Sequence, residues 1–124
     1  MSNAPTVLFG LVPLVRCTVR SLADATATTV TEDDSGSLFI NLSTSIHTYT
    51  LPAVADGKGK SWLFFDANTT AAMKVASTAA NIMAVDSATG TTLTDDAVLG
   101  SCVLIIGDGT NYLAFIISGT WTVV

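Results

Sequence analysis

Charged side chains are scarce in this sequence. Asp, Glu, Lys and Arg make up 12% of its 124 residues, whereas 49% of the residues are hydrophobic. A typical soluble domain carries about 25% charged residues, so much of this surface must consist of neutral Ser, Thr, Ala and Gly. With so few charges and so many apolar side chains, we expect another chain to cover part of the apolar surface.

Basic residues and long hydrophobic runs are also lacking. Five Lys and Arg face ten Asp and Glu, for a net charge of −5, which argues against a nucleic-acid partner. The longest apolar run, "VLFGLVPLV", is interrupted by Pro13 and is much shorter than the roughly 20 residues of a spanning helix. It also lacks the basic start and small-residue cleavage site of a secretory signal. We therefore expect neither a membrane partner nor secretion.

Residues that could perform catalysis are few. The single histidine, His47, alternates with Tyr49 in "SIHTYT", and we interpret it as a surface or interface residue rather than a catalytic base. No nucleophile motif is present, and we predict that the chain is not an enzyme. Cys17 and Cys102 lie in apolar surroundings and are predicted to be free, buried thiols, with a disulfide between them as the alternative.

The stretch "VADGKGKSW" raises the possibility of a phosphate-binding loop. Gly59-Lys60-Ser61 fits the end of the G-x-x-x-x-G-K-S/T pattern, but Val54 occupies the position of its leading glycine. The following "SWLFFD" is typical of a strand, where a phosphate loop would open a helix. We therefore predict a turn around Asp56-Gly57 and no cofactor.

Two acidic clusters stand beside predicted turns, Glu32-Asp33-Asp34 and Asp95-Asp96. Aspartate is favoured there because it bonds to nearby backbone, so we predict no metal site. Calcium held by aspartates gathered at a trimer axis is the weaker alternative. The two tryptophans, Trp62 and Trp121, are predicted core residues, with a sugar-binding role as the alternative.

Short alternating segments separated by turn residues dominate the chain. Residues 15–20 ("VRCTVR") alternate strictly, and "LFINLS" places Leu38, Ile40 and Leu42 on one face. Further strands are expected in "SIHTYTLP", "SWLFFD" and the final "GTWTVV". "SCVLIIG" and "NYLAFIIS" form a predicted hairpin, apolar on both faces as in the centre of a packed sheet. Residues 69–85 fit a helix or strands, and we favour strands.

These observations predict an all-β, single-domain antiparallel sandwich or barrel, jelly-roll or β-tulip-like. Prolines at positions 5 and 13 exclude residues 1–14 from a central strand, so this region is predicted to be an extended arm. Residues 1–20 then comprise the arm and first strand, and residues 21–124 the body. No internal repeat is visible.

The order of several pieces resembles a β-rich module of tailed-phage virion proteins. The matching pieces are Asp34-Ser35-Gly36, Thr50-Leu51-Pro52, Gly59 with Trp62 and Phe64, Asp108-Gly109 with Tyr112, and Gly119-Thr120-Trp121. They cover roughly residues 30 to 124. Short chains of this kind resemble capsid decoration, or cement, proteins, which are typically homotrimers on the outer capsid surface. The resemblance thus implies the major capsid protein and the chain itself as partners, on virions assembled in the bacterial cytoplasm.

The arm is the predicted contact with the capsid, since an apolar extended segment can add to the edge of a neighbour's sheet. Its candidate contact residues are Val7, Leu8, Phe9, Leu11, Val12, Leu14 and Arg16. A fibre-type adhesin that binds host carbohydrate through its loops is the alternative function. Asp56, Lys58 and Lys60 are the candidate loop contacts.

Overall fold

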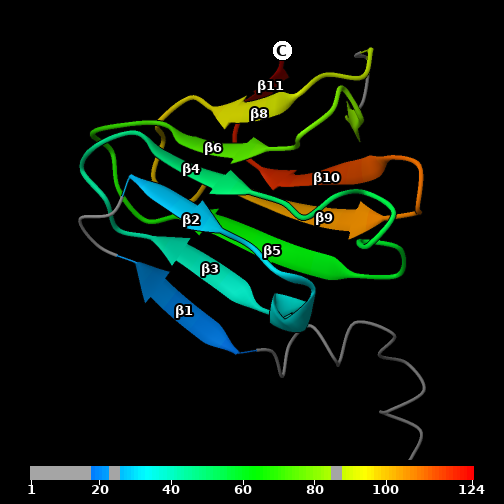
Figure 1. The fold of residues 1–124 in the computed structure, drawn as a ribbon. Helices are drawn as coiled ribbons and strands as arrows, with labels where there is room; N and C mark the ends of the chain where they lie inside the picture. The colour runs from blue at the N-terminus through cyan, green and yellow to red at the C-terminus, as the bar shows by residue number, and fades with distance from the viewer. Residues whose placement is uncertain (1–17, 23–25, 85–87) are drawn as a thin grey trace, which may run out of the picture.

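The computed structural model describes residues 18–22, 26–84 and 88–124, which form two β-sheets packed face to face (Figure 1). Sheet A runs in the order β1 (Val19–Leu22), β3 (Leu38–Asn41), β5 (Ser61–Asp66), β9 (Cys102–Gly107), β10 (Tyr112–Ser118) and β7 (Ile82–Met83). Sheet B runs in the order β11 (Trp121–Val123), β8 (Thr92–Asp95), β6 (Met73–Ala76), β4 (His47–Thr50) and β2 (Ala27–Thr29). The predicted all-β sandwich is confirmed.

Strand direction corrects one part of that prediction, because the sheets are mixed rather than antiparallel. The first six strands alternate between the sheets, so that β1, β3 and β5 run parallel in sheet A and β2, β4 and β6 run parallel in sheet B. Antiparallel pairing begins only with β8 and with the β9–β10 hairpin. The first half of the chain therefore passes back and forth between the two sheets with parallel pairing in each, unlike the antiparallel strands of a jelly roll.

The alternation of side chains explains most of the strands. In β5, Trp62 and Phe64 are fully buried whereas Leu63 and Phe65 are half-buried on the other face. The strand prediction for residues 69–85 holds for β6 and β7. Two elements in the polar passage 21–37 escaped prediction: β2 and a short 3-10 helix, η1 (Glu32–Asp34), whose Asp34 carboxylate accepts the N–H of Thr31. β2 was missed because its residues are Ala and Thr, without the alternating large apolar residues that predict a strand.

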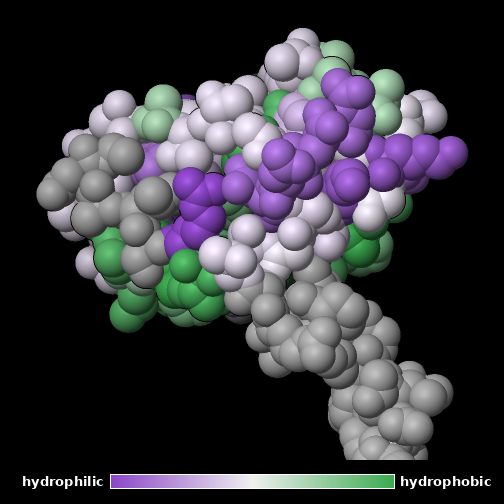
Figure 2. Space-filling view, turned by 60° about the horizontal axis from the view of Figure 1, so that its bottom comes forward, coloured by the Kyte–Doolittle hydropathy of each residue, from purple (hydrophilic) through white to green (hydrophobic). Residues whose placement is uncertain are grey.

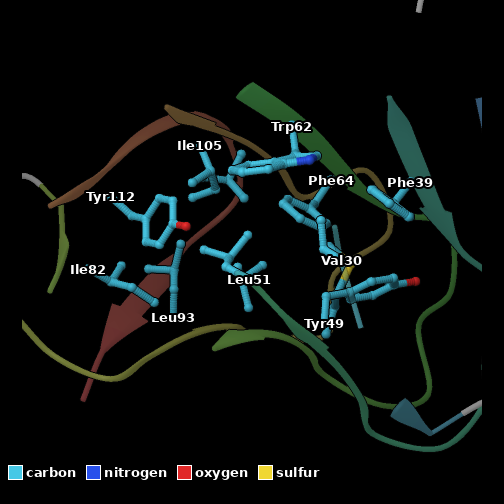
Figure 3. Packing of buried hydrophobic residues seen from close by; sticks show 13 residues of the cluster. Val30, Phe39, Tyr49, Leu51, Trp62, Phe64, Ile82, Leu93, Ile105 and Tyr112 are labelled. Carbon is cyan, nitrogen blue, oxygen red and sulfur yellow. The ribbon is translucent and has the colours of Figure 1, made fainter. Parts of the chain in front are cut away.

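Aromatic residues dominate the core between the sheets (Figure 3). Phe39, Tyr49 and Phe64 form one aromatic group with ring centroids 5.3–5.6 Å apart. Trp62 packs edge-on against Tyr112 at 6.0 Å, which makes Trp62 a core residue as predicted. Trp121 is half-buried against the same core and donates its indole N–H to Ser118 O at 3.0 Å.

The segment between β4 and β5 is a turn, as predicted, and it is fastened to the β9–β10 hairpin. Gly59 donates its N–H to Gly107 O at 2.8 Å, and Gly107 donates to Lys60 O at 3.0 Å. A Cβ atom on Gly57 would meet the Tyr112 ring, and one on Gly107 would meet the Gly57 carbonyl oxygen. Glycine is therefore required at both positions, because other atoms approach too closely for a side chain.

Candidate docking surface

The outer face of sheet A is mostly apolar. Backbone register aligns Val19, Leu38, Leu63, Leu104 and Phe115 in one row across five strands. A second row runs from Ser61 through Ile106 and Leu113 to Met83 on β7. Ile40, Phe65 and Ile117 extend the same face. We call these residues the apolar face, and no Asp, Glu, Lys or Arg of the described strands interrupts it.

The outer face of sheet B has the opposite character. The residues that alternate with its buried ones are Thr48 and Thr50 on β4, Lys74 and Ala76 on β6, and Thr92 and Thr94 on β8. Threonine hydroxyl groups exchange hydrogen bonds with water at no cost, whereas exposed Leu, Ile and Phe order water around them. The sandwich thus has one face suited to solvent and one suited to contact.

Exposure is greatest at the margins of the apolar face. Val19 is 58% exposed, Phe115 50% and Ile117 60%. The central residues Leu38, Leu63 and Leu104 shield one another and are half-buried. Contiguous apolar surface of this kind marks interaction sites in soluble proteins. Covering one such Leu or Phe completely contributes about 1.5–3 kcal/mol.

A groove opens at the β10 end of this surface. Its lining comes from β7, β10 and the residue after β7: Met83, Ala84, Leu113, Ala114, Phe115 and Ile116. All six side chains are apolar, and the groove encloses about 530 Å³. It has the size and chemistry to accept aliphatic or aromatic side chains of a partner.

Charged residues gather instead at the loop end where β3 and β5 begin and β9 ends. Glu32 and Asp33 lie in η1, and Arg20 pairs with Asp34 at 2.6 Å. Figure 2 shows a band of hydrophilic residues across the molecule, with hydrophobic residues along its lower border. The charged loop end is therefore a different part of the surface from the apolar face.

The predicted loop contacts lie at this charged end. Asp56 and Lys58 are exposed and Lys60 is half-buried. Beside them, backbone N–H groups of Asn111 and Thr110 and the nearby Lys58 lower the pKa of the exposed Asp108 carboxyl group. The seven predicted arm residues, Val7 to Arg16, lie outside the described residues, as does Cys17.

A pair of carboxyl groups is buried inside the sandwich, away from both surfaces. Asp66 on β5 is 0% exposed and Asp95 on β8 is 5% exposed. Asn68 and Asn41 donate to Asp66 Oδ1 at 2.6 and 3.1 Å, and the Met73 N–H donates to Asp95 Oδ1 at 2.7 Å. The other oxygen of each carboxyl group has no donor, although the two groups are within hydrogen-bonding reach of each other.

The surroundings of Asp66 favour the protonated form of its carboxyl group. Burial, together with the hydrogen bond and negative charge of Asp95, raises the pKa of Asp66 to about 7. Among the described residues, no three His, Cys, Asp or Glu side chains gather to hold a metal ion. The predicted turn role is thus wrong for Asp95, which lies in the buried strand β8. The sequence does not predict the burial of Asp66, because a single aspartate after an aromatic run has no distinguishing pattern.

His47 is buried, which corrects the prediction of a surface or interface residue. It is 0% exposed, its ring stacks on Tyr49 with centroids 4.2 Å apart, and its Nε2 atom is 2.7 Å from Thr28 Oγ1. Burial lowers the pKa of His47. Cys102 is a buried free thiol, as predicted, and burial raises its pKa.

Sequence reasoning found the strands of the apolar face without recognising the face. Leu38 and Ile40 share one face as predicted, but Phe39 and Asn41 are the residues that point into the core. The β9–β10 hairpin is apolar on both sides, yet only one side is packed within the described chain. The sequence feature that indicates the apolar face is the presence of apolar residues on both faces of β9 and β10.

Comparison with family models finds no matching family, and comparison with curated proteins finds no matching relative. No helix within the described ranges is long and apolar enough to cross a membrane. The fold and surface therefore define the chain as an all-β sandwich with one apolar outer face and one threonine-rich outer face.

Proposed function

We propose that this chain is a bacteriophage capsid decoration protein, which binds the outer capsid surface as a homotrimer and stabilises the head. The observation that carries the proposal is the apolar face of sheet A, whose residues on the described strands include no Asp, Glu, Lys or Arg. The resemblance of the motifs, in their order along the chain, to a phage virion module supports this function.

The proposed contact divides between two parts of the chain. The apolar face lies against the capsid or a neighbouring copy, and the arm, with Val7 to Leu14, extends the contact beyond the body. The threonine-rich face and charged loops remain in solvent. Many identical lattice sites and several copies per site make weak individual contacts sufficient.

Co-sedimentation with decoration-free phage capsids tests this function. The full chain should bind saturably, and Leu104→Lys should raise the dissociation constant at least about tenfold because it places a charge inside the contact. Thr94→Lys, on the outer face of sheet B, is the matched control and should bind like the parent. Absence of saturable binding by the full chain would overturn the proposal.

A fibre-type adhesin is the second candidate, favoured by the fastened loops that present Asp56 and Lys58. It predicts binding to host-surface polysaccharide that is lost in Lys58→Ala and unaffected by Leu104→Lys. The two variants assayed on both targets therefore separate the functions.

A further inference from the structure

Strand β10 offers an incomplete edge. β7 pairs with it only at Tyr112 and Leu113. The N–H and C=O groups of Ile82 in β7 both form hydrogen bonds with Gly90, at 2.9 Å each. Beyond Leu113, within residues 18–22, 26–84 and 88–124, no strand pairs with β10 on the side away from β9. Among the described residues, the stretch Ala114–Ile117 therefore has no strand partner on that side.

The orientation of backbone groups shows what this edge can bind. Tyr112 donates its N–H to Asn81 O at 2.8 Å, on the β7 side. Because N–H and C=O groups alternate between the two edges of a strand, those of Ile116 point to that same side. Phe115, Ile116 and Ile117 remain 37–60% exposed around these groups. An apolar edge with unpaired backbone is a template for strand addition.

The N-terminal segment of the same protein has the matching chemistry. Residues 7–12, "VLFGLV", carry no charge and lie between Pro5 and Pro13, so all six have a backbone N–H to donate. Their alternate side chains are of the aliphatic and aromatic kind that the groove beside Met83 and Leu113 accepts. The β2 and β1 edges fit less well, since β2 exposes Ala27 and Thr29 and β1 carries the paired Arg20.

Chain length decides which copy supplies the segment. β1 lies at the opposite edge of sheet A, and at a strand spacing of about 4.8 Å the position beyond β10 is about 24 Å from it. Six residue steps separate Thr18 from Val12 and span at most about 22 Å. That link is too short to cross the molecule's own sheet, so the segment of another copy is needed.

We propose that residues 7–12 of one copy add as a strand to Ala114–Ile117 of a neighbouring copy and fill the groove beside it. Donor and acceptor are at opposite edges of sheet A, so each contact is head-to-tail, and a closed ring satisfies every copy. The inference deepens the proposed function, on which its biological setting rests, by assigning the arm to the self-contact of the decoration oligomer.

Light scattering of the purified full chain tests the inference. The full chain should have the mass of a small ring, and removal of residues 2–14 should reduce the mass to that of one chain. Ile116→Pro should do the same, because it deletes the edge N–H; Ile116→Val keeps that N–H and should remain assembled. Circular dichroism verifies that each variant is folded.

Amide hydrogen exchange gives a second measurement that needs no proline variant. Ile116 should exchange at least about tenfold more slowly in the full chain than after removal of residues 2–14. An Ile116 rate unaffected by the truncation, or a monomeric full chain, would overturn the inference. Capsid co-sedimentation is an independent test. A ring that does not bind capsids would refute only the decoration function, whereas a monomer that binds capsids would refute only the strand exchange.

Discussion

The buried Asp66 carboxyl group should make the stability of this protein depend on pH. The pKa of Asp66 is raised from 3.8 to about 7 in the folded protein, first by burial and then by Asp95. Between about pH 4 and pH 7 the folded state therefore holds a proton that the unfolded chain has released. The free energy of unfolding must fall as pH rises through this window, by up to about 1.4 kcal/mol per pH unit, and level off above it.

Asp66→Asn should remove this dependence. The amide keeps an oxygen for Asn68 and Asn41 and supplies a permanent hydrogen toward Asp95, so the variant should gain stability relative to the parent from pH 5 to pH 8. Melting temperatures at both pH values measure the difference. His47, whose pKa is lowered, opposes the slope below its ordinary 6.5 but cancels in this comparison. Asp96→Asn, at an exposed neighbour, is the control. Parallel curves for Asp66→Asn and the parent would refute the raised pKa of Asp66.

At the scale of the element, neighbouring residues on one strand have opposite roles. Ile105 points into the core and is 0% exposed, whereas Leu104 belongs to the apolar face. Ile105→Thr should lower the free energy of unfolding by about 2–4 kcal/mol, because it leaves a cavity and buries a hydroxyl group. Leu104→Thr should cost less than about 1 kcal/mol in the unassembled protein.

Urea unfolding of the two variants, both made without residues 2–14, measures this contrast. Equal losses would mean that Leu104 is packed inside the chain and would remove it from the apolar face. The parent truncated protein supplies the reference.

The sequence predicts the elements better than their pairing. Alternation in residues 61–66 and the turn at Gly107–Thr110 identify β5 and the β9–β10 hairpin because period and turn chemistry are local. Parallel pairing of β3 with β5 joins residues 25 positions apart, and no local pattern encodes it. The burial of His47 escaped for the same reason, since Thr28 and Tyr49 enclose it only after β2 and β4 pair.

The candidate site was only half predictable. Apolar composition with few charges indicates a contact surface, but alternation cannot say which of two apolar faces is covered. In β9 and β10 both faces qualify, and the packing of sheet B against Val103 and Ile105 decides the matter.

At the scale of the whole molecule, folding and assembly should be coupled. A contact that exists only between folded copies stabilises the folded state in proportion to the logarithm of concentration. The melting temperature of the full chain should therefore rise by several degrees over a hundredfold increase in protein concentration. Without residues 2–14 it should be constant, and a constant value for the full chain as well would contradict strand exchange. Scanning calorimetry over that concentration range makes the measurement.

The position of β7 also has a kinetic consequence. Its two residues pair with Tyr112 and Leu113, which follow them by 30 positions, so β7 has no place in sheet A until the β9–β10 hairpin has formed. Non-local pairing of this sort is slow to form, and a two-residue strand is among the first to open. We therefore expect β7, which borders the groove, to pair late in folding and to open early in unfolding. The strand that we propose to add to β10 could then pair before β7 is in place.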